Sequence, residues 1–405
     1  MRNKIVSTRQ VFPAIGLMLA APLLVPAQQG APGKTAGQVY KNIQVLQDTP
    51  STQFIPGMRF IATALGVECE FCHTGNRSED TPNKITARKM MAMTLALNKQ
   101  NFNGRLEVSC YTCHKGNHDP VNAPVPTGEY SAAGPTAFYR PTAPPVGATD
   151  EVMFEAYKDV MKEEQAAKAA SLPTAEQILA KYVTALGGEQ ALRSVTSRVI
   201  TSTTELAPNV RGAGPTIFVQ QTQYFKAPNL YMTTLQKFDG TQTAKGFDGA
   251  DAWTQNPNGT VVVASGTDLE RAKRDADFYE SINLKSEYTR LNVRGIEKVG
   301  TRDAYLVVGF PAGDNRESLY FDTQTGLLLR KGTFNTTPVG NYTIQTDYSD
   351  YRDIKGVKVP FLISTLTVSP ADTTVVHVEK VENNVAIDPG KFTRPASKPP
   401  AARAR

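Results

Sequence analysis

The chain has 405 residues, which is long enough for two domains of ordinary size. Its formal charge of +6 falls to +3 once the basic residues Arg2, Lys4 and Arg9 are set aside, so strong electrostatic steering by the whole molecule is not expected. No basic run is interleaved with aromatic residues, and this excludes nucleic acid as an expected partner.

Residues 1–27 have the pattern of a secretory signal peptide. Three basic residues are followed by an apolar run over 11–25, and Val25-Pro-Ala27 offers a small-residue cleavage site. The apolar run is short for a membrane span, and an uncleaved N-terminal anchor is the alternative. We therefore expect the protein to be exported to the periplasm.

All four cysteines of the chain lie in two motifs of the form C-x-x-C-H. The motifs are Cys69-Glu-Phe-Cys72-His73 and Cys110-Tyr-Thr-Cys113-His114. This pattern is the attachment signature of a c-type haem, in which the cysteines form thioethers to the porphyrin and the histidine binds the iron. A structural zinc site or two redox dithiols would also use cysteines, but neither explains a histidine directly after each second cysteine. We expect two covalent haems, with His73 and His114 as proximal iron ligands.

A helix is predicted before the first motif, over Phe54–Leu65. Pro56 suits its first turn and Gly66 suits its C-cap. Met58 lies in this segment, fifteen residues before His73, and could place its thioether over the first haem. Core packing is the alternative role for this methionine, because methionine fills irregular gaps well.

A second helix is predicted over Ile85–Leu97, with Asn83 as a plausible cap. One of its faces is formed by Ala87, Met90, Thr94 and Leu97. We expect Met91 and Met93 to pack in the core. Each half therefore consists of a helix, a turn and a short helix that carries the motif.

Residues 37–124 resemble the tetrahaem cytochrome c subunit of photosynthetic reaction centres. The resemblance is carried by Phe54-x-x-x-Met58, by Ala87-Arg-Lys-Met90-Met-Ala-Met93-Thr, and by Val108-Ser-Cys-Tyr-Thr-Cys-His-Lys-Gly116 ahead of Pro120. It implies that Met58 and Met90 are the distal iron ligands. The family holds four haems in two halves, whereas one half is present here. Its distal histidine between the second methionine helix and the second motif has no counterpart in residues 98–109. A dihaem relative is expected, and a photosynthetic role does not follow.

Residues 125–173 are predicted to form a linker rich in proline, alanine and threonine, ending in a charged helix over 150–170. A new domain, residues 174–395, begins with the capping box Thr174-Ala-Glu-Gln177 and a helix that Gly187-Gly188 ends. Residues 396–405 are expected to be a disordered tail.

Beyond this helix the apolar period changes to two, which predicts strands. The predicted strands are Val195–Leu206, Thr216–Lys226, Leu230–Lys237, Gly259–Ala264, Ala304–Phe310, Glu317–Asp322, Leu327–Lys331, Asn341–Tyr348, Val357–Leu366 and Thr373–Val381, with a helix over Thr267–Phe278. The strand alternation predicts an apolar concave face.

Two stretches of this domain resemble the outer-membrane lipoprotein-sorting (carrier) family. They are Tyr320-Phe-Asp-x-x-Thr-Gly326 and the segment from Asp347 to Phe361. The resemblance implies an open half-barrel with a helix across its mouth. The expected fold class is α + β multidomain: an N-terminal all-α dihaem c-type cytochrome domain, then an antiparallel β half-barrel with a helix plug.

The expected function is electron transfer between periplasmic or membrane-bound redox proteins through two His/Met-ligated haems. No catalytic constellation appears in residues 174–395, and a methionine candidate for each haem favours an electron carrier over an enzyme. A dihaem peroxidase is one alternative, and it needs a haem with an open distal position. The other alternative is a carrier of a lipid or another apolar ligand in the C-terminal domain, with a tethered redox domain.

Overall fold

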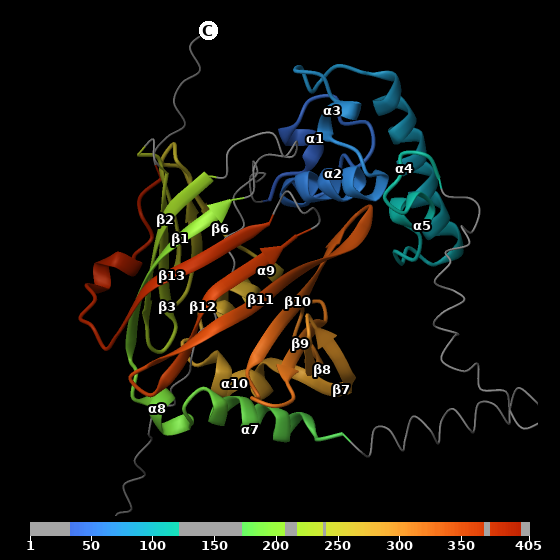
Figure 1. Cartoon of the computed structure of the whole chain (residues 1–405). Helices are drawn as coiled ribbons and strands as arrows, with labels where there is room; N and C mark the ends of the chain where they lie inside the picture. Colours follow the sequence, from blue (N-terminus) through green and yellow to red (C-terminus); the bar gives the residue numbers. More distant parts are fainter. Residues whose placement is uncertain (1–32, 121–171, 207–216, 238–239, 368–372, 398–405) are drawn as a thin grey trace, which may run out of the picture.

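The computed structural model describes residues 33–120, 172–206, 217–237, 240–367 and 373–397. The predicted signal peptide, the charged helix and almost all of the linker and tail lie outside these described residues. A helical N-terminal region lies at one end of a C-terminal region that is built on one large sheet (Figure 1). The α + β organisation expected from the sequence is therefore confirmed.

Two longer helices and three short ones form the described part of the N-terminal region. They are α1 (Ala36–Val39), α2 (Ser51–Leu65), α3 (Cys69–Cys72), α4 (Pro82–Asn101) and α5 (Cys110–His114). Each C-x-x-C-H motif thus lies on a single helical turn that follows a longer helix. This is the order of elements that the sequence predicts.

The ends of α2 and α4 differ partly from expectation. Gly66 ends α2 in the left-handed conformation, as predicted, with φ of 65°. Because α2 begins at Ser51, Pro56 lies inside the helix rather than in its first turn. Thr81, and not Asn83, caps α4. Pro82 occupies the first helical position, and the Thr81 hydroxyl accepts a hydrogen bond from the backbone amide of Lys84.

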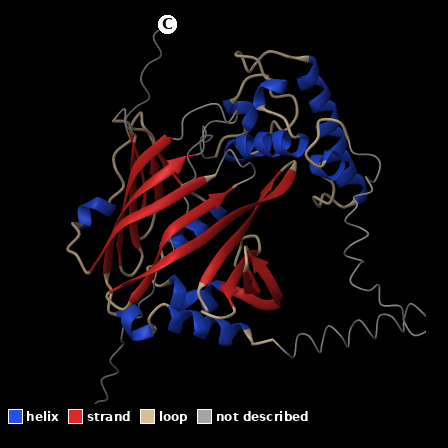
Figure 2. Cartoon of the chain, viewed as in Figure 1, coloured by secondary structure: helices blue, strands red, loops and turns tan. Residues whose placement is uncertain are grey.

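Thirteen antiparallel strands form one sheet in the C-terminal region (Figure 2). The strands are β1 (Ser197–Leu206), β2 (Ile217–Lys226), β3 (Leu230–Gln236), β4 (Gln242–Phe247), β5 (Ala252–Gln255), β6 (Val261–Val263), β7 (Tyr288–Val299), β8 (Arg302–Pro311), β9 (Glu317–Asp322), β10 (Leu328–Thr337), β11 (Gly340–Ile354), β12 (Val357–Leu366) and β13 (Thr374–Asn383). Their order is β6-β5-β4-β3-β2-β1-β13-β12-β11-β10-β9-β8-β7, so β6 and β7 are the two edges and the sheet stays open.

The strand prediction is most accurate where alternation is clean. The bounds of β9 and β12 are those predicted. Strands β4, β5 and β7 were not predicted. In β7 a register shift between Val293 and Gly295 interrupts the alternation on which the prediction relies.

Four further helices pack on this sheet, and a short 3₁₀ turn follows the last strand. They are α7 (Ala175–Ala185), α8 (Glu189–Arg193), α9 (Thr267–Asp275), α10 (Glu280–Glu287) and the turn Pro389–Phe392. The capping box at Thr174 is confirmed, since the Thr174 and Gln177 side chains each accept from the other's backbone amide. Helix α9 ends three residues earlier than predicted.

The main hydrophobic core lies where α7 and α10 cover one end of the sheet (Figure 1). Tyr182 and Leu186 of α7 are fully buried, and the Tyr182 ring lies 5.2 Å from that of Phe321 on β9. Leu284 of α10 is buried in the same cluster. Fully burying one such side chain contributes about 1.5–3 kcal/mol, so these helices hold the curled sheet at this end.

The inner face of the sheet is not apolar throughout, contrary to expectation. Ser202 and Gln223 lie two residues from the core side chains Ile200 and Phe225, so they share the inner face. Thr233 pairs with Gln223 across β2 and β3. Ser202 Oγ, Gln223 Oε1 and Thr233 Oγ1 are buried without a hydrogen-bond partner. Alternation identifies which residues face inward, but not whether they are apolar.

A buried ion cluster lies between α10 and strands β9 and β10. Lys331 Nζ is 3.3 Å from both Glu280 Oε1 and Glu317 Oε2, and the Tyr288 hydroxyl donates to Glu317 at 2.6 Å. Burial raises the pKa of Glu280, and Lys331 partly opposes this rise. Burial also disfavours the charged Lys331, but the two carboxylates outweigh it and raise the pKa of the amine.

We predict that Lys331→Ala destabilises the protein by about 3–5 kcal/mol, because it leaves two buried carboxylates without their cation. Lys285→Ala is the matched control, since Lys285 Nζ lies 3.0 Å from Glu176 in an exposed ion pair. The control should lose less than about 1 kcal/mol. Urea unfolding followed by circular dichroism measures both, and equal losses would contradict the prediction.

Candidate haem-binding region

The four cysteines lie on the one-turn helices α3 and α5, and none of them forms a disulfide. Burial is the main factor that raises the pKa of the Cys72 thiol and of the Cys110 thiol. A redox dithiol typically has a thiol whose pKa is lowered. Neither Cys72 nor Cys110 has this property.

His114 is oriented in the way a metal-binding imidazole requires. Its Nδ1 lies 3.0 Å from the backbone oxygen of Asn117. When Nδ1 carries the ring proton, it donates to this oxygen, and Nε2 keeps the lone pair that binds a metal. A main-chain carbonyl thus fixes both the ring orientation and the tautomer in which Nε2 is the ligand.

His73 is half-buried in a positively charged environment. Its pKa is lowered, chiefly by burial and then by the charges of Lys84, Arg77 and Arg88. Nδ1 of His73 is buried and makes no well-formed hydrogen bond, while the Arg77 backbone lies close enough to oppose part of this shift. The ring is therefore neutral near pH 7, the state in which imidazole binds a metal.

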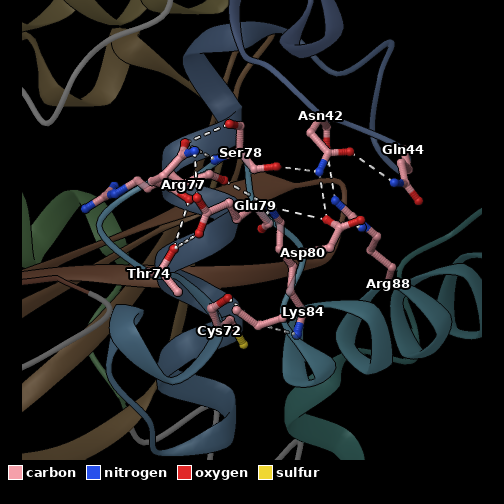
Figure 3. Close-up of polar contacts among 12 residues, drawn as sticks. Asn42, Gln44, Cys72, Thr74, Arg77, Ser78, Glu79, Asp80, Lys84 and Arg88 are labelled. Atoms are coloured by element: carbon pink, nitrogen blue, oxygen red, sulfur yellow. Dashed lines mark hydrogen bonds and ion pairs between the residues drawn. The ribbon is translucent and has the colours of Figure 1, made fainter.

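The loop after the first motif is held by a polar network around Asp80 (Figure 3). Arg88, which is buried on α4, places Nη1 2.8 Å from Asp80 Oδ1 and donates from Nη2 to the Asn42 backbone oxygen at 3.0 Å. The Asn42 side chain also donates to Asp80, at 2.7 Å. The Arg88 side chain is the largest contributor that lowers the pKa of Asp80. The network joins the segment before α2, this loop and α4.

The beginning of α4 is bonded directly to the first motif. The Thr81 hydroxyl donates to the Cys72 backbone oxygen at 2.8 Å, and Asn83 Nδ2 donates to the Phe71 backbone oxygen at 2.9 Å. These are terminal carbonyls of α3, which have no partner within a one-turn helix. The motif is therefore fixed on the N-terminus of α4.

Asn98 fixes the loop before the second motif on the end of α4. The sequence analysis did not identify this residue. It is buried at the end of α4, where its Oδ1 accepts from the amides of Glu107 and Val108 at 3.1 and 2.9 Å. Its Nδ2 donates to the Val108 backbone oxygen at 2.7 Å. The signal available in the sequence was the spacing of Met91, Thr94 and Asn98, which places Asn98 on the same helical face as Met91.

Helix α2 packs against α5 at a contact that only glycine allows. The amide of Gly116 donates to the Ala64 backbone oxygen at 2.9 Å. A Cβ on Gly66 would lie 2.0 Å from the Gly116 oxygen. The first methionine helix and the second motif are therefore in backbone contact.

The methionines of α4 divide into buried and exposed. Met91 lies in the hydrophobic core with 9% of its surface exposed, as expected. Met93 was expected in the core as well, but it is 48% exposed, and Met90 is 39% exposed. Because they are three residues apart on a helix, Met90 and Met93 point to similar sides. Met58 is partly buried against the cluster that contains Met91. The assignment of Met58 and Met90 as iron ligands stays a prediction.

The donor set of each motif fits a covalently attached haem. It comprises two thiols on one helical turn and one imidazole with a neutral, metal-binding form. Within the described ranges, no three His, Cys, Asp or Glu side chains are grouped so that they could hold a metal ion. A structural zinc site takes four such ligands.

Residues 18–180 match the family model of the photosynthetic reaction centre cytochrome C subunit. This part of the chain is therefore similar to a part of that subunit. The match is wider than the resemblance seen in residues 37–124, and it covers less than half of the chain.

Individual relatives show the same partial overlap. The chain is 34% identical over 105 residues to the reaction center cytochrome c subunit of Rubrivivax gelatinosus, covering 25% of this chain and 28% of that protein. It is 35% identical over 97 residues to the Thermochromatium tepidum subunit, with 22% and 24% covered. Cytochrome c-554 of Chloroflexus aurantiacus is 37% identical over 90 residues, with 20% and 21% covered. The chain thus spans about a quarter of the length of these relatives.

The C-terminal region resembles solved LolA-like proteins. A LolA superfamily protein from Nitrosomonas europaea is 14% identical with a TM-score of 0.40, and the match covers 55% of this chain and 99% of that protein. A putative outer membrane lipoprotein-sorting protein domain from Vibrio parahaemolyticus is 15% identical with a TM-score of 0.37, over 49% and 89% of the two chains.

We predict that Met90→Ala lowers the potential of one haem by an amount on the order of 0.1 V, because axial ligands set haem potentials over roughly 0.8 V. It should also remove that haem's sulfur-to-iron charge-transfer absorption. Met93→Ala is the matched control, since Met93 is also exposed on the same helix, and it should change neither property. Spectroelectrochemistry of the oxidised and reduced proteins measures both, and an effect confined to Met93→Ala would reassign the ligand.

Proposed function

We propose that the protein is a periplasmic dihaem c-type cytochrome that transfers electrons between redox partners. The observation that carries the proposal is the orientation of the His114 ring. Its Nδ1 faces a backbone oxygen, which leaves Nε2 for a metal, and Cys110 and Cys113 lie on the same helical turn. When bound, each haem supplies one-electron redox chemistry. In this proposal, Cys69, Cys72, Cys110 and Cys113 hold two haems, and His73 and His114 are the proximal ligands.

The chain's own residues orient and seat these groups. Asn117 fixes the tautomer of His114, and the polar networks around Arg88 and Asn98 fix the loops that bear the two motifs. Met58 and Met90 supply distal thioethers in this proposal. Methionine raises the potential relative to a second histidine, which suits donation to an acceptor of high potential.

Electron transfer is favoured over the peroxidase alternative by the supply of methionines. A peroxidase needs a haem whose distal position is open or displaceable. Here the helix before each motif carries a methionine that is not fully buried in the core. These residues are Met58 on α2 and Met90 on α4. We therefore propose redox proteins as the partners, with no substrate of the protein's own.

Lipid carriage is not part of the proposal. The buried hydroxyl and amide groups on the inner face of the sheet do not suit an apolar ligand. Export is proposed from the signal pattern of residues 1–27. In the parts of the chain that the structure describes, no helix has both the length and the apolar character needed to cross a membrane.

We predict that the purified protein carries two covalent haems. Intact mass and haem staining after a denaturing gel should show two per chain, one when Cys69 and Cys72 are both changed to serine, and one when Cys110 and Cys113 are. Peroxide turnover should be absent in the wild type and should appear in Met58→Ala, which frees a distal position. A chain without covalent haem, or with one bound zinc, would overturn the proposal, and rapid wild-type peroxide turnover would favour the enzyme.

A further inference from the structure

The hairpin that joins β10 and β11 ends in a buried tip. Its turn residues are Pro338 and Val339, and the Thr337 hydroxyl donates to the Gly340 backbone oxygen across the turn at 2.8 Å. Hairpin turns usually lie in solvent, but only 2% of the Val339 surface is exposed. Figure 1 shows this tip reaching away from the sheet to α2.

The tip packs directly on α2, the helix that carries Met58. Val339 Cγ2 would lie 3.6 Å from a Cβ on Gly57, the residue before Met58. On the other side, the ring of Phe60 lies over Gly340, where a Cβ would come within 2.3 Å of two ring carbons. Gly340 therefore allows the hairpin and the helix to approach closely, while at Gly57 the contact with Val339 is at an ordinary distance.

The contact completes a core that belongs to the cytochrome region. Val339 is in the same buried cluster as Phe60, Ile61 and Met91, and Met58 and Cys110 pack against that cluster. Beside it, residues of α2, of β11 and of the second motif's neighbourhood surround an open cavity of about 280 Å³, lined by Phe60, Thr63, Ala64, Ser109, Tyr111, Asn341, Tyr342, Thr343 and Thr367. The C-terminal domain thus contributes to the packing around α2 and next to the second motif.

We infer that the β10–β11 hairpin tip positions α2 and thereby keeps the Met58 thioether on the first haem. The inference rests on the proposed function, because it takes Met58 as a distal ligand. Val339 and Gly340 are positioning residues that act through Phe60 and Gly57. Since packed interiors transmit strain, a displacement of the tip moves α2. The sheet thereby controls a haem potential without touching the iron.

The test uses full-length protein with both haems. In Gly340→Ala the new methyl group meets the Phe60 ring, so Phe60 of α2 must shift. We expect one of the two haems to lose its sulfur-to-iron absorption, to fall in potential and to bind carbon monoxide when reduced. Val339→Ala should produce the same changes to a smaller extent. Haem content should stay at two per chain.

Two variants separate positioning from general damage. Gly332→Ala is the matched control, because Gly332 lies on β10 of the same hairpin and its Cβ would meet Ser318 at an ordinary 3.6 Å; it should leave both haems unchanged. The double variant Phe60→Leu/Gly340→Ala removes the clashing ring atoms and should restore the absorption and the potential. Two haems with unmoved spectra in both Gly340→Ala and Val339→Ala would overturn the inference alone. A wild type without covalent haem would overturn the proposed function as well.

Discussion

Helix α2 is packed between two unrelated neighbours, and the geometry of the N-terminal region depends on both contacts. On one side, the Gly116 amide donates to the Ala64 oxygen, at a separation that a side chain on Gly66 would forbid. On the other, Val339 and Gly340 of the C-terminal sheet fill the surface around Phe60. Because protein interiors are close-packed, neither contact can shift without the other. The second motif, the first methionine helix and the sheet therefore form one mechanical unit.

Helix α4 is the template on which the two motif loops are built. Its buried face has Arg88 near the beginning, Met91 and Thr94 in the middle and Asn98 near the end. Arg88 donates a hydrogen bond to Asp80 in the loop after the first motif. Asn98 accepts a hydrogen bond from the Val108 amide in the loop before the second motif. A buried arginine is costly unless it is paired, and a buried amide is costly unless it is bonded. These two side chains therefore specify loop conformations that apolar residues at the same positions would leave open.

The features that were predictable from the sequence are local ones. The two motifs, the left-handed Gly66 and the capping box at Thr174 depend on residues a few positions apart, and the structure has each element where it was expected. The predictions that failed concern burial, which depends on residues far apart in the sequence. Met93 was expected in the core by analogy with Met91, but a helix has only one buried face. The burial of Val339 could not be predicted, because a two-residue hairpin turn is polar or exposed unless another domain covers it.

The inner face of the sheet shows that the polarity of its side chains was also difficult to predict from the sequence pattern. Alternation in β2 correctly places Gln223 and Phe225 on one face, yet one is polar and the other apolar. Leaving a buried polar group unsatisfied costs about 1–3 kcal/mol, so a face that includes Ser202, Gln223 and Thr233 is a poor container for an apolar chain. By completing the core around α2, the contact at Val339 makes the sheet part of the packing of the N-terminal region. This contact requires no ligand, and a likeness of fold alone assigns the sheet no carrier role.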